Sequence, residues 1–179
     1  MKKNKIVITG GPGTGKSSIV HQLEEKGHSC LHEVSREVIR EARLSGIDQL
    51  FLEDPVLFSR KLLEGRRKQF LEAEAFPSDH IFIDRGIPDV VAYMDYFNTS
   101  YSEEFTVPCE NYRYNFIFIL PPWEAIYKSD NERYESFQEA SKISKYLQKT
   151  YQTYGYEPIK VPEASVEERA NFILHRIGF

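Results

Sequence analysis

The sequence contains little cysteine and no long apolar run. Its two cysteines, Cys30 and Cys109, stand far apart and form no CxxC pair, so we expect free thiols in a reducing compartment. No apolar run approaches the roughly 18 to 20 residues that a membrane-spanning helix needs. The first apolar segment follows Met1 to Lys5 directly, without a small-residue cleavage site, which argues against a signal peptide. We therefore predict a cytoplasmic protein without a membrane span.

An excess of basic residues is also absent. The 23 Lys and Arg residues against 27 Asp and Glu residues give a formal net charge of −4, so we expect no nucleic-acid partner. The 179 residues are 41% apolar and 28% charged, as in a globular protein. Because no linker rich in Gly, Ser or Pro divides the chain, we predict one domain over residues 1–179.

Strands and helices alternate along the chain, which predicts an α/β fold with a mainly parallel sheet. Short β-branched or aromatic runs indicate strands at 5–9, 28–33, 80–84, 114–120 and 158–161. Apolar periodicity and capping signals indicate helices at 15–26, 34–44, 54–75, 88–97, 137–154 and 165–178. The segment 100–113 is poorly patterned, and we expect an irregular insert there.

The decisive motif lies between the first strand and the first helix. The segment GGPGTGKS matches GxxxxGK[ST] in the required context. Glycines let backbone N–H groups approach a polyphosphate, and the following helix adds its positive end. A glycine-rich turn that binds nothing would not need the whole pattern. We predict that the nucleotide is bound by Gly10, Gly11, Pro12, Gly13, Thr14, Gly15, Lys16, Ser17 and Ser18, with the Ser17 hydroxyl on magnesium.

The third predicted strand ends in a carboxylate. Asp84 follows an apolar run, so it could hold magnesium or accept a proton from an attacking hydroxyl; the alternative is a cap on the next turn. Arg85 could place its planar guanidinium against a phosphoryl group, or lie solvated at the surface. Asp89 could contact the substrate or stabilise a helix N-terminus.

The second predicted strand ends at Glu33, and Arg36 lies one turn into the next helix. Ligands of open α/β sheets bind at the carboxyl ends of the strands. Glu33 could therefore orient or deprotonate a hydroxyl, and Arg36 could bind an anionic substrate; the alternative is a surface ion pair. We interpret two further basic groups as solvated helix faces: Arg40 and Arg43, and then Arg60, Lys61, Arg66, Arg67 and Lys68.

A dense polar stretch follows the fourth predicted strand. Phosphoryl transfer needs its developing charge neutralised and water excluded, which a closing segment that carries arginine achieves. We predict a mobile lid around 122–136, with Arg133 as its arginine and Lys128 second. An ordinary charged connection is the alternative.

Five stretches recur together in one order: GGPGTGKS, HEVSREVIRE, IFIDRGIPDVVAY, LPPWEAIYKSDNERYESFQEA and YGYEPIKVPEASVEERANFIL. Together they resemble the small AAA-like P-loop family that includes the nicotinamide-riboside kinase-like domain of the bacterial NAD regulator. The resemblance implies a P-loop three-layer sandwich with strand order 2-3-1-4-5, and ATP or GTP with magnesium. It assigns phosphate, metal and lid roles to Lys16, Ser17, Asp84, Arg85 and Arg133, and it matches Glu33 and Arg36 to the family's second-strand acid and arginine.

We accordingly predict a Mg²⁺-dependent kinase that transfers the γ-phosphoryl group of ATP to a small acceptor of the nucleoside or nucleotide type. The alternatives are a switch that hydrolyses ATP or GTP slowly, and an ATPase of partner assembly. An NKxD motif, typical of GTPases, is absent, which favours ATP. The chain also lacks a recognisable second-region arginine finger, which argues against a hexameric motor. The oligomeric state does not follow from the sequence.

Overall fold

The structure, a computed structural model, describes residues 3–127 and 135–179. It contains five parallel strands in the order β2-β3-β1-β4-β5, as the resemblance implied. The strands are β1 (Asn4–Gly10), β2 (Ser29–Leu31), β3 (His80–Asp84), β4 (Phe116–Leu120) and β5 (Ile159–Lys160).

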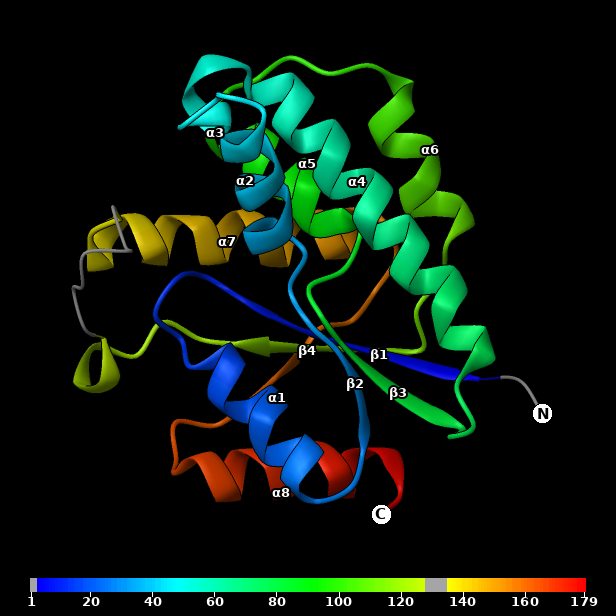
Figure 1. Cartoon of the computed structure of the whole chain (residues 1–179). Helices are drawn as coiled ribbons and strands as arrows, with labels where there is room; N and C mark the ends of the chain where they lie inside the picture. The colour runs from blue at the N-terminus through cyan, green and yellow to red at the C-terminus, as the bar shows by residue number, and fades with distance from the viewer. Residues whose placement is uncertain (1–2, 128–134) are drawn as a thin grey trace.

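Helices cover both faces of the sheet (Figure 1). On one face lie α1 (Lys16–Glu25) and α8 (Val166–Ile177). The other face carries α2 (Ser35–Leu44), α3 (Leu50–Glu53), α4 (Pro55–Glu72), α5 (Pro88–Tyr96), α6 (Glu103–Asn111) and α7 (Phe137–Thr153). Apart from the two 3₁₀ turns of the described residues, Ala73–Ala75 and Glu124–Ile126, this is the predicted three-layer sandwich.

The two larger apolar cores follow from the alternation of side chains along each strand. On β1, Ile6 and Ile8 pack toward α1 and α8, whereas Val7 packs toward the helices of the opposite face. All three are fully buried, because a central parallel strand is covered on both sides. Because all five strands run parallel, the carboxyl ends of the strands lie at one edge of the sheet, between the helical layers.

Sequence-level capping signals are confirmed at several helix ends. Asp54 accepts a hydrogen bond from the Leu57 N–H (2.9 Å) at the start of α4. Ser165 and Glu168 form a capping box at the start of α8, and Gly178 ends that helix with φ 96°. These local signals are reliable because each is a hydrogen bond between near neighbours.

The predicted irregular insert at 100–113 is wrong, because α6 occupies most of it. Its apolar stripe is short: Phe105 and Cys109 lie one turn apart and are both buried against the core. Pro108, inside the helix, and the acidic first turn hid this stripe from the sequence. The extra turn α3 was not predicted, and β2 ends at Leu31, so Glu33 lies in the connection to α2.

Both cysteines are free thiols, as predicted. Within residues 3–127 and 135–179, no helix is long and apolar enough to cross a membrane.

Candidate active site

The loop between β1 and α1 needs glycine for two physical reasons. Gly13 and Gly15 adopt left-handed φ values of 72° and 86°, which side chains disfavour. At Gly10 and Gly11, an added Cβ would lie 2.7 Å from the carbonyl oxygens of Leu120 and Ala140, respectively. The loop is therefore closely packed against β4 and α7. In the part of the chain that the structure describes, no side chain caps the N-terminus of α1, so its first N–H groups can receive an anion.

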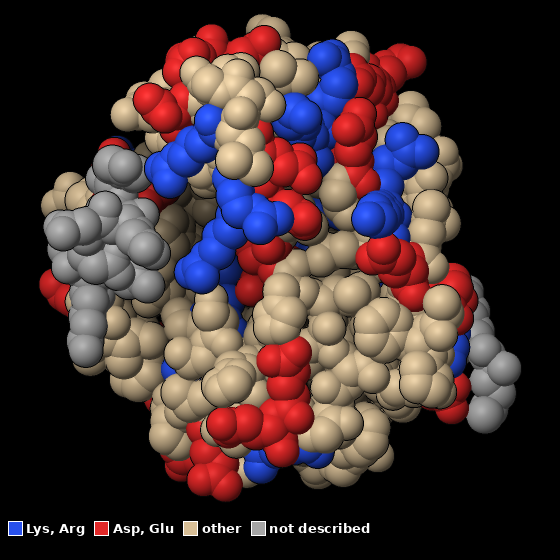
Figure 2. Space-filling model, in the orientation of Figure 1, with Lys and Arg blue, Asp and Glu red and all other residues tan. Residues whose placement is uncertain are grey.

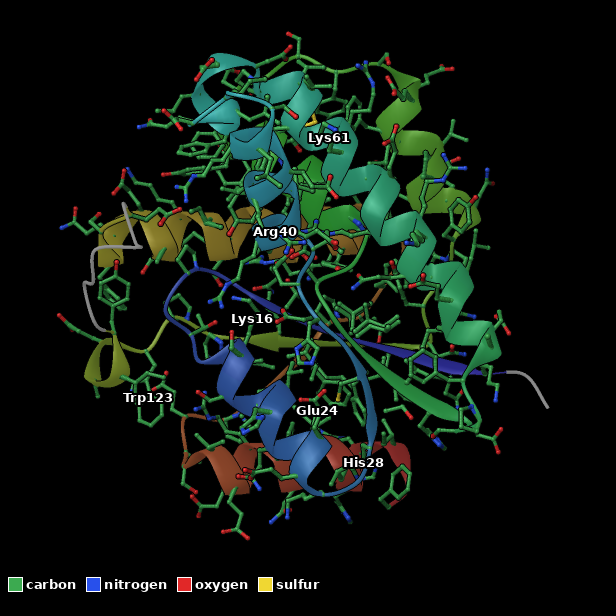
Figure 3. All side chains as sticks on the ribbon, in the orientation of Figure 1. Lys16, Glu24, His28, Arg40, Lys61 and Trp123 are labelled. Carbon is green, nitrogen blue, oxygen red and sulfur yellow. The ribbon has the colours of Figure 1, made fainter. Side chains whose placement is uncertain are left out.

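A hydrogen bond within the loop and contacts from the C-terminal helix α8 support the loop. The Thr14 hydroxyl donates to the Gly11 carbonyl oxygen (2.9 Å). Arg169 of α8 donates from Nη1 to the Thr14 carbonyl oxygen (3.0 Å). Arg169 is 5% exposed and lies over the Trp123 ring, 5.7 Å from its centroid; Figure 3 labels Trp123 beside the loop. No sequence pattern pointed to Arg169, because only the tertiary fold brings α8 to the loop.

Lys16 begins α1 and turns back over the loop. Its Nζ donates to the carbonyl oxygens of Gly10 (2.8 Å) and Gly11 (2.9 Å). Burial, together with the cation of Arg85, lowers the pKa of Lys16 to about 7 from 10.5. An anionic ligand would favour the charged amine, so this environment is poised for polyphosphate.

One cavity of about 250 Å³ joins three segments of the chain. Figure 2 shows Lys and Arg side chains along a hollow on this face, and Figure 3 shows Lys16 at the start of α1 below Arg40 of α2. The lining comprises Pro12, Gly13, Gly15, Lys16, Ser17, Ser18, Glu33, Ser35, Arg36, Asp84 and Arg85. The predicted phosphate-binding residues and the predicted second-strand residues therefore face a common space.

Asp84 ends β3 beside β1, where it pairs in register with Ile8. The residue is 4% exposed, and its Oδ1 has no hydrogen-bond partner among the described residues. Burial raises the pKa of Asp84, against the opposing effect of the Lys16 cation. Asp84 lines the same cavity as the exposed Ser17, and a buried carboxylate oxygen that has no donor among the described residues fits a magnesium ion, which prefers oxygen ligands.

Four charged side chains form a neutral, largely buried cluster at the wall of the cavity, which two of them, Glu33 and Arg85, line. Glu33 receives a hydrogen bond from Arg66 Nη2 (3.2 Å) and lies 2.5 Å from Arg85 Nε. Arg85 Nη1 donates to Asp89 Oδ1 (3.0 Å). Burial alone would raise the pKa of Glu33, but Arg66 and Arg85 outweigh it and hold that pKa below its ordinary value. Glu33 is therefore ionised and fixed in place.

The structure places Asp89 behind Arg85, outside the cavity lining. Asp89 is fully buried and accepts four hydrogen bonds: from Thr9 Oγ1 (2.6 Å), Arg85 Nη1 (3.0 Å), Gly86 N–H (3.1 Å) and Tyr151 Oη (2.5 Å). Its carboxylate is thus occupied by the protein.

Arg36 is exposed at the cavity and has no ion pair within residues 3–127 and 135–179. Arg133 and Lys128 lie outside the described residues. At the borders of that segment, the Tyr127 hydroxyl donates to the Glu135 carbonyl oxygen, and the Tyr127 and Phe137 rings meet edge to face at 5.5 Å. The predicted lid role of Arg133 stays a prediction.

The interpretation of Arg66 as a solvated cation is wrong. Arg66 is 3% exposed and also donates to the Gly86 carbonyl oxygen (3.2 Å). A signal was present: Leu62, Arg66 and Phe70 follow one another at four-residue spacing, so Arg66 lies on the apolar stripe of α4. Tyr151 and Thr9, which hold Asp89, carried no such signal.

The family described as AAA domain matches residues 5–169. No curated protein matches the sequence. A solved structure of deoxyadenosine kinase from M. mycoides with the products dCMP and dCDP is 17% identical, with a TM-score of 0.69, over 97% of this chain and 98% of that one. A NadR protein in complex with NR is 16% identical, with a TM-score of 0.72, over 97% of this chain and 51% of that one.

At these identities the solved structures establish the fold alone, and the present chain spans about half of NadR. The match to the family covers most of the sequence and confirms the predicted resemblance. This chain therefore belongs to the AAA-domain family of P-loop proteins, and its fold is that of the small P-loop nucleotide kinases.

Proposed function

We propose that the protein is a Mg²⁺-dependent kinase that transfers the γ-phosphoryl group of ATP to a hydroxyl group of a small, nucleoside- or nucleotide-type acceptor. One observation carries this proposal: a single cavity joins the phosphate-binding loop to an ionised carboxylate and two guanidinium groups, those of Glu33, Arg36 and Arg85. A nucleotide-gated switch needs the phosphate-binding loop to hold its nucleotide. It does not need a carboxylate and two guanidinium groups in the same cavity.

The donor side follows from the loop. The amides at the start of α1 and Lys16 would hold the β- and γ-phosphates. Ser17 and Asp84 would hold magnesium, which when bound would supply positive charge against the negative charge of the phosphates. As a ligand of such an ion, Asp84 would be a poor proton acceptor. This leaves Glu33 for the acceptor.

Glu33 would accept a hydrogen bond from the acceptor hydroxyl and so orient its oxygen. That oxygen attacks the γ-phosphorus and forms the new P–O bond, while the bond to the β–γ bridging oxygen breaks and ADP leaves. The hydroxyl proton passes to the Glu33 carboxylate and then to solvent. A weakly basic carboxylate suffices, because phosphoryl transfer rests mainly on positioning and electrostatic stabilisation.

Arg85 would stabilise the transferring group. Two of its nitrogens face the carboxylates of Glu33 and Asp89, and Nη2 has no hydrogen-bond partner among the described residues. The side chain of Arg85 is 11% exposed and lines the cavity. A guanidinium fixed in this way suits an oxyanion that develops charge during the reaction.

The similar structures support the substrate classes. The M. mycoides protein is a deoxyadenosine kinase whose structure holds dCMP and dCDP. NadR has been solved with NAD and AMP-PNP, and with NR. These ligands favour an adenine nucleotide as donor and a nucleoside-type acceptor.

The test is a panel of nucleosides, nucleotides and small alcohols with ATP and Mg²⁺. We expect at least one to raise ADP release above the background without acceptor, with a matching phosphorylated product by mass spectrometry. The variant Lys16→Ala should show no turnover. It also serves as the control for contaminating enzymes. Glu33→Gln should lower transfer by about 100-fold or more and leave ATP binding intact. Equal ADP release with and without every acceptor would instead indicate a hydrolytic switch.

A further inference from the structure

Tyr151 of α7 lies behind the candidate active site, at the carboxylate that holds Arg85. Its hydroxyl donates to Asp89 Oδ2 at 2.5 Å, and the whole side chain is buried. Burial, followed by the adjacent Asp89 charge, raises the pKa of Tyr151 well above its ordinary value. The phenol therefore stays protonated and acts as a permanent donor to Asp89.

The turn that carries Arg85 depends on this contact. Arg85 has a φ of 70°, which non-glycine residues rarely adopt and which requires support from its surroundings. The next residue, Gly86, donates its N–H to the same oxygen of Asp89 that Tyr151 contacts (3.1 Å). An added Cβ at Gly86 would lie 2.5 Å from the Tyr151 hydroxyl oxygen. The hydroxyl thus fills the space beside the turn.

The orientation of the Arg85 side chain also depends on the Tyr151 hydroxyl. Its Nη1 is held by Asp89 Oδ1, and the four donors to Asp89 leave that carboxylate a single orientation. Removal of the Tyr151 hydroxyl would leave the Gly86 N–H as the remaining donor to Asp89 Oδ2 among the described residues, and so weaken the constraint on the orientation of the carboxylate. Asp89 would then hold the Arg85 guanidinium less firmly, although Glu33 would still contact its Nε.

The same helix also contacts the phosphate-binding loop. Gly11 lies against the Ala140 carbonyl oxygen of α7, at a spacing that admits no Cβ. Ala140 and Tyr151 are separated by 11 residues of one helix, or about 16 Å at the rise of an α-helix. One rigid element therefore touches both the donor loop and the support of Arg85.

We propose that Tyr151 is a positioning residue for phosphoryl transfer: through Asp89 it fixes the Arg85 guanidinium relative to the phosphate-binding loop. This inference rests on the proposed kinase function for its kinetic consequence. Its structural consequence, an ordered Arg85, is independent of that function.

The kinetic test uses Tyr151→Phe, which removes one oxygen atom and keeps the ring. We expect kcat to fall by about 10-fold while KM for ATP changes by less than about twofold, because the loss concerns the transition state. Tyr156→Phe is the matched control: its hydroxyl is also in the core, where it accepts a hydrogen bond from the Tyr114 N–H (3.2 Å). This control should keep kcat within about twofold of the parent.

A double-mutant cycle distinguishes positioning from a general loss of stability. In an Arg85→Ala background, Tyr151→Phe should cause no further loss of kcat, because its effect passes through the absent guanidinium. An equal further loss in that background, or equal losses in the two tyrosine variants, would overturn the proposal.

The structural test needs no acceptor. In ¹⁵N NMR spectra of the free protein, we expect the Arg85 Nε–H resonance, assigned by its loss in Arg85→Lys, to shift or broaden in Tyr151→Phe and to stay unchanged in Tyr156→Phe. An unchanged resonance in Tyr151→Phe refutes the positioning role whatever the reaction. A changed resonance in a protein without transferase activity would refute the proposed function and leave the positioning contact intact.

Discussion

ATP binding to this protein should take up a proton on Lys16 when the pH is above neutral. In the free protein, burial and the Arg85 cation lower the pKa of Lys16 to about 7. A neutral amine has two N–H donors, and Nζ donates to two carbonyl oxygens, those of Gly10 and Gly11. The triphosphate would replace these partners with anions and raise the pKa.

The magnitude follows from the fraction of neutral Lys16 before binding. With a pKa of about 7, about nine tenths of the amines are neutral at about pH 8 and about one tenth at about pH 6. The uptake should therefore be about 0.9 proton at about pH 8 and about 0.1 at about pH 6. Lys16 has the lowered pKa in the free protein and a higher one in the ATP complex, so the amine must gain a proton on binding. ATP affinity should therefore decrease as pH rises through 7, by up to about tenfold per pH unit.

The assay is calorimetry with a non-hydrolysable ATP analogue and Mg²⁺ in two buffers of different ionisation enthalpy. The difference between the apparent enthalpies gives the number of protons taken up. Lys16→Arg is the matched control, because guanidinium stays charged throughout this range and should bind without uptake. An absence of uptake in the parent at about pH 8 would refute the lowered pKa; equal uptake in Lys16→Arg would assign the proton to another group.

Three further changes test other parts of the site. Asp84→Asn should lose the Mg²⁺ stimulation of turnover yet keep metal-free nucleotide binding, in magnesium titrations of both; unchanged stimulation would remove Asp84 from the metal site. Gly86→Ala, whose methyl group would meet the Tyr151 hydroxyl, should lower the free energy of unfolding in urea by about 1–3 kcal/mol; no loss would mean that the turn relaxes freely. Arg36→Ala should raise KM by about 10-fold for an anionic acceptor and leave a neutral nucleoside unaffected; equal effects on both would contradict anion binding.

The parts of this protein that sequence patterns predict are those set by neighbours in the chain. The strand at His80–Asp84 and the box of Ser165 and Glu168 rest on local periodicity and capping, so their positions were accurate. The phosphate-binding loop is likewise a continuous motif whose glycines are required by backbone conformation and close packing. Such features need no knowledge of which helices meet.

The supporting residues depend on contacts between distant elements, and sequence patterns predict them poorly. Tyr151 lies on a regular apolar stripe of α7 and looks like an ordinary core residue, yet its hydroxyl contacts Asp89, 62 residues away in the chain. Arg66 stood among solvated cations of α4, although its place on the apolar stripe should have marked it as buried. A charged residue on an apolar stripe therefore indicates a buried partner of opposite charge.

The neutral cluster of Glu33, Arg66, Arg85 and Asp89 is costly for stability alone. Apolar side chains of similar volume would often serve as well, whereas removal of one member would leave an uncompensated buried charge, at a cost of about 3–5 kcal/mol. Its location supplies a reason to retain it: two of its members, Glu33 and Arg85, line the cavity with fixed orientations. Groups oriented before the ligands arrive need no rearrangement during the reaction. On this view the desolvation of four charges is the energetic cost of a preorganised site, which is why a single hydroxyl at its rear, that of Tyr151, should be measurable in kcat.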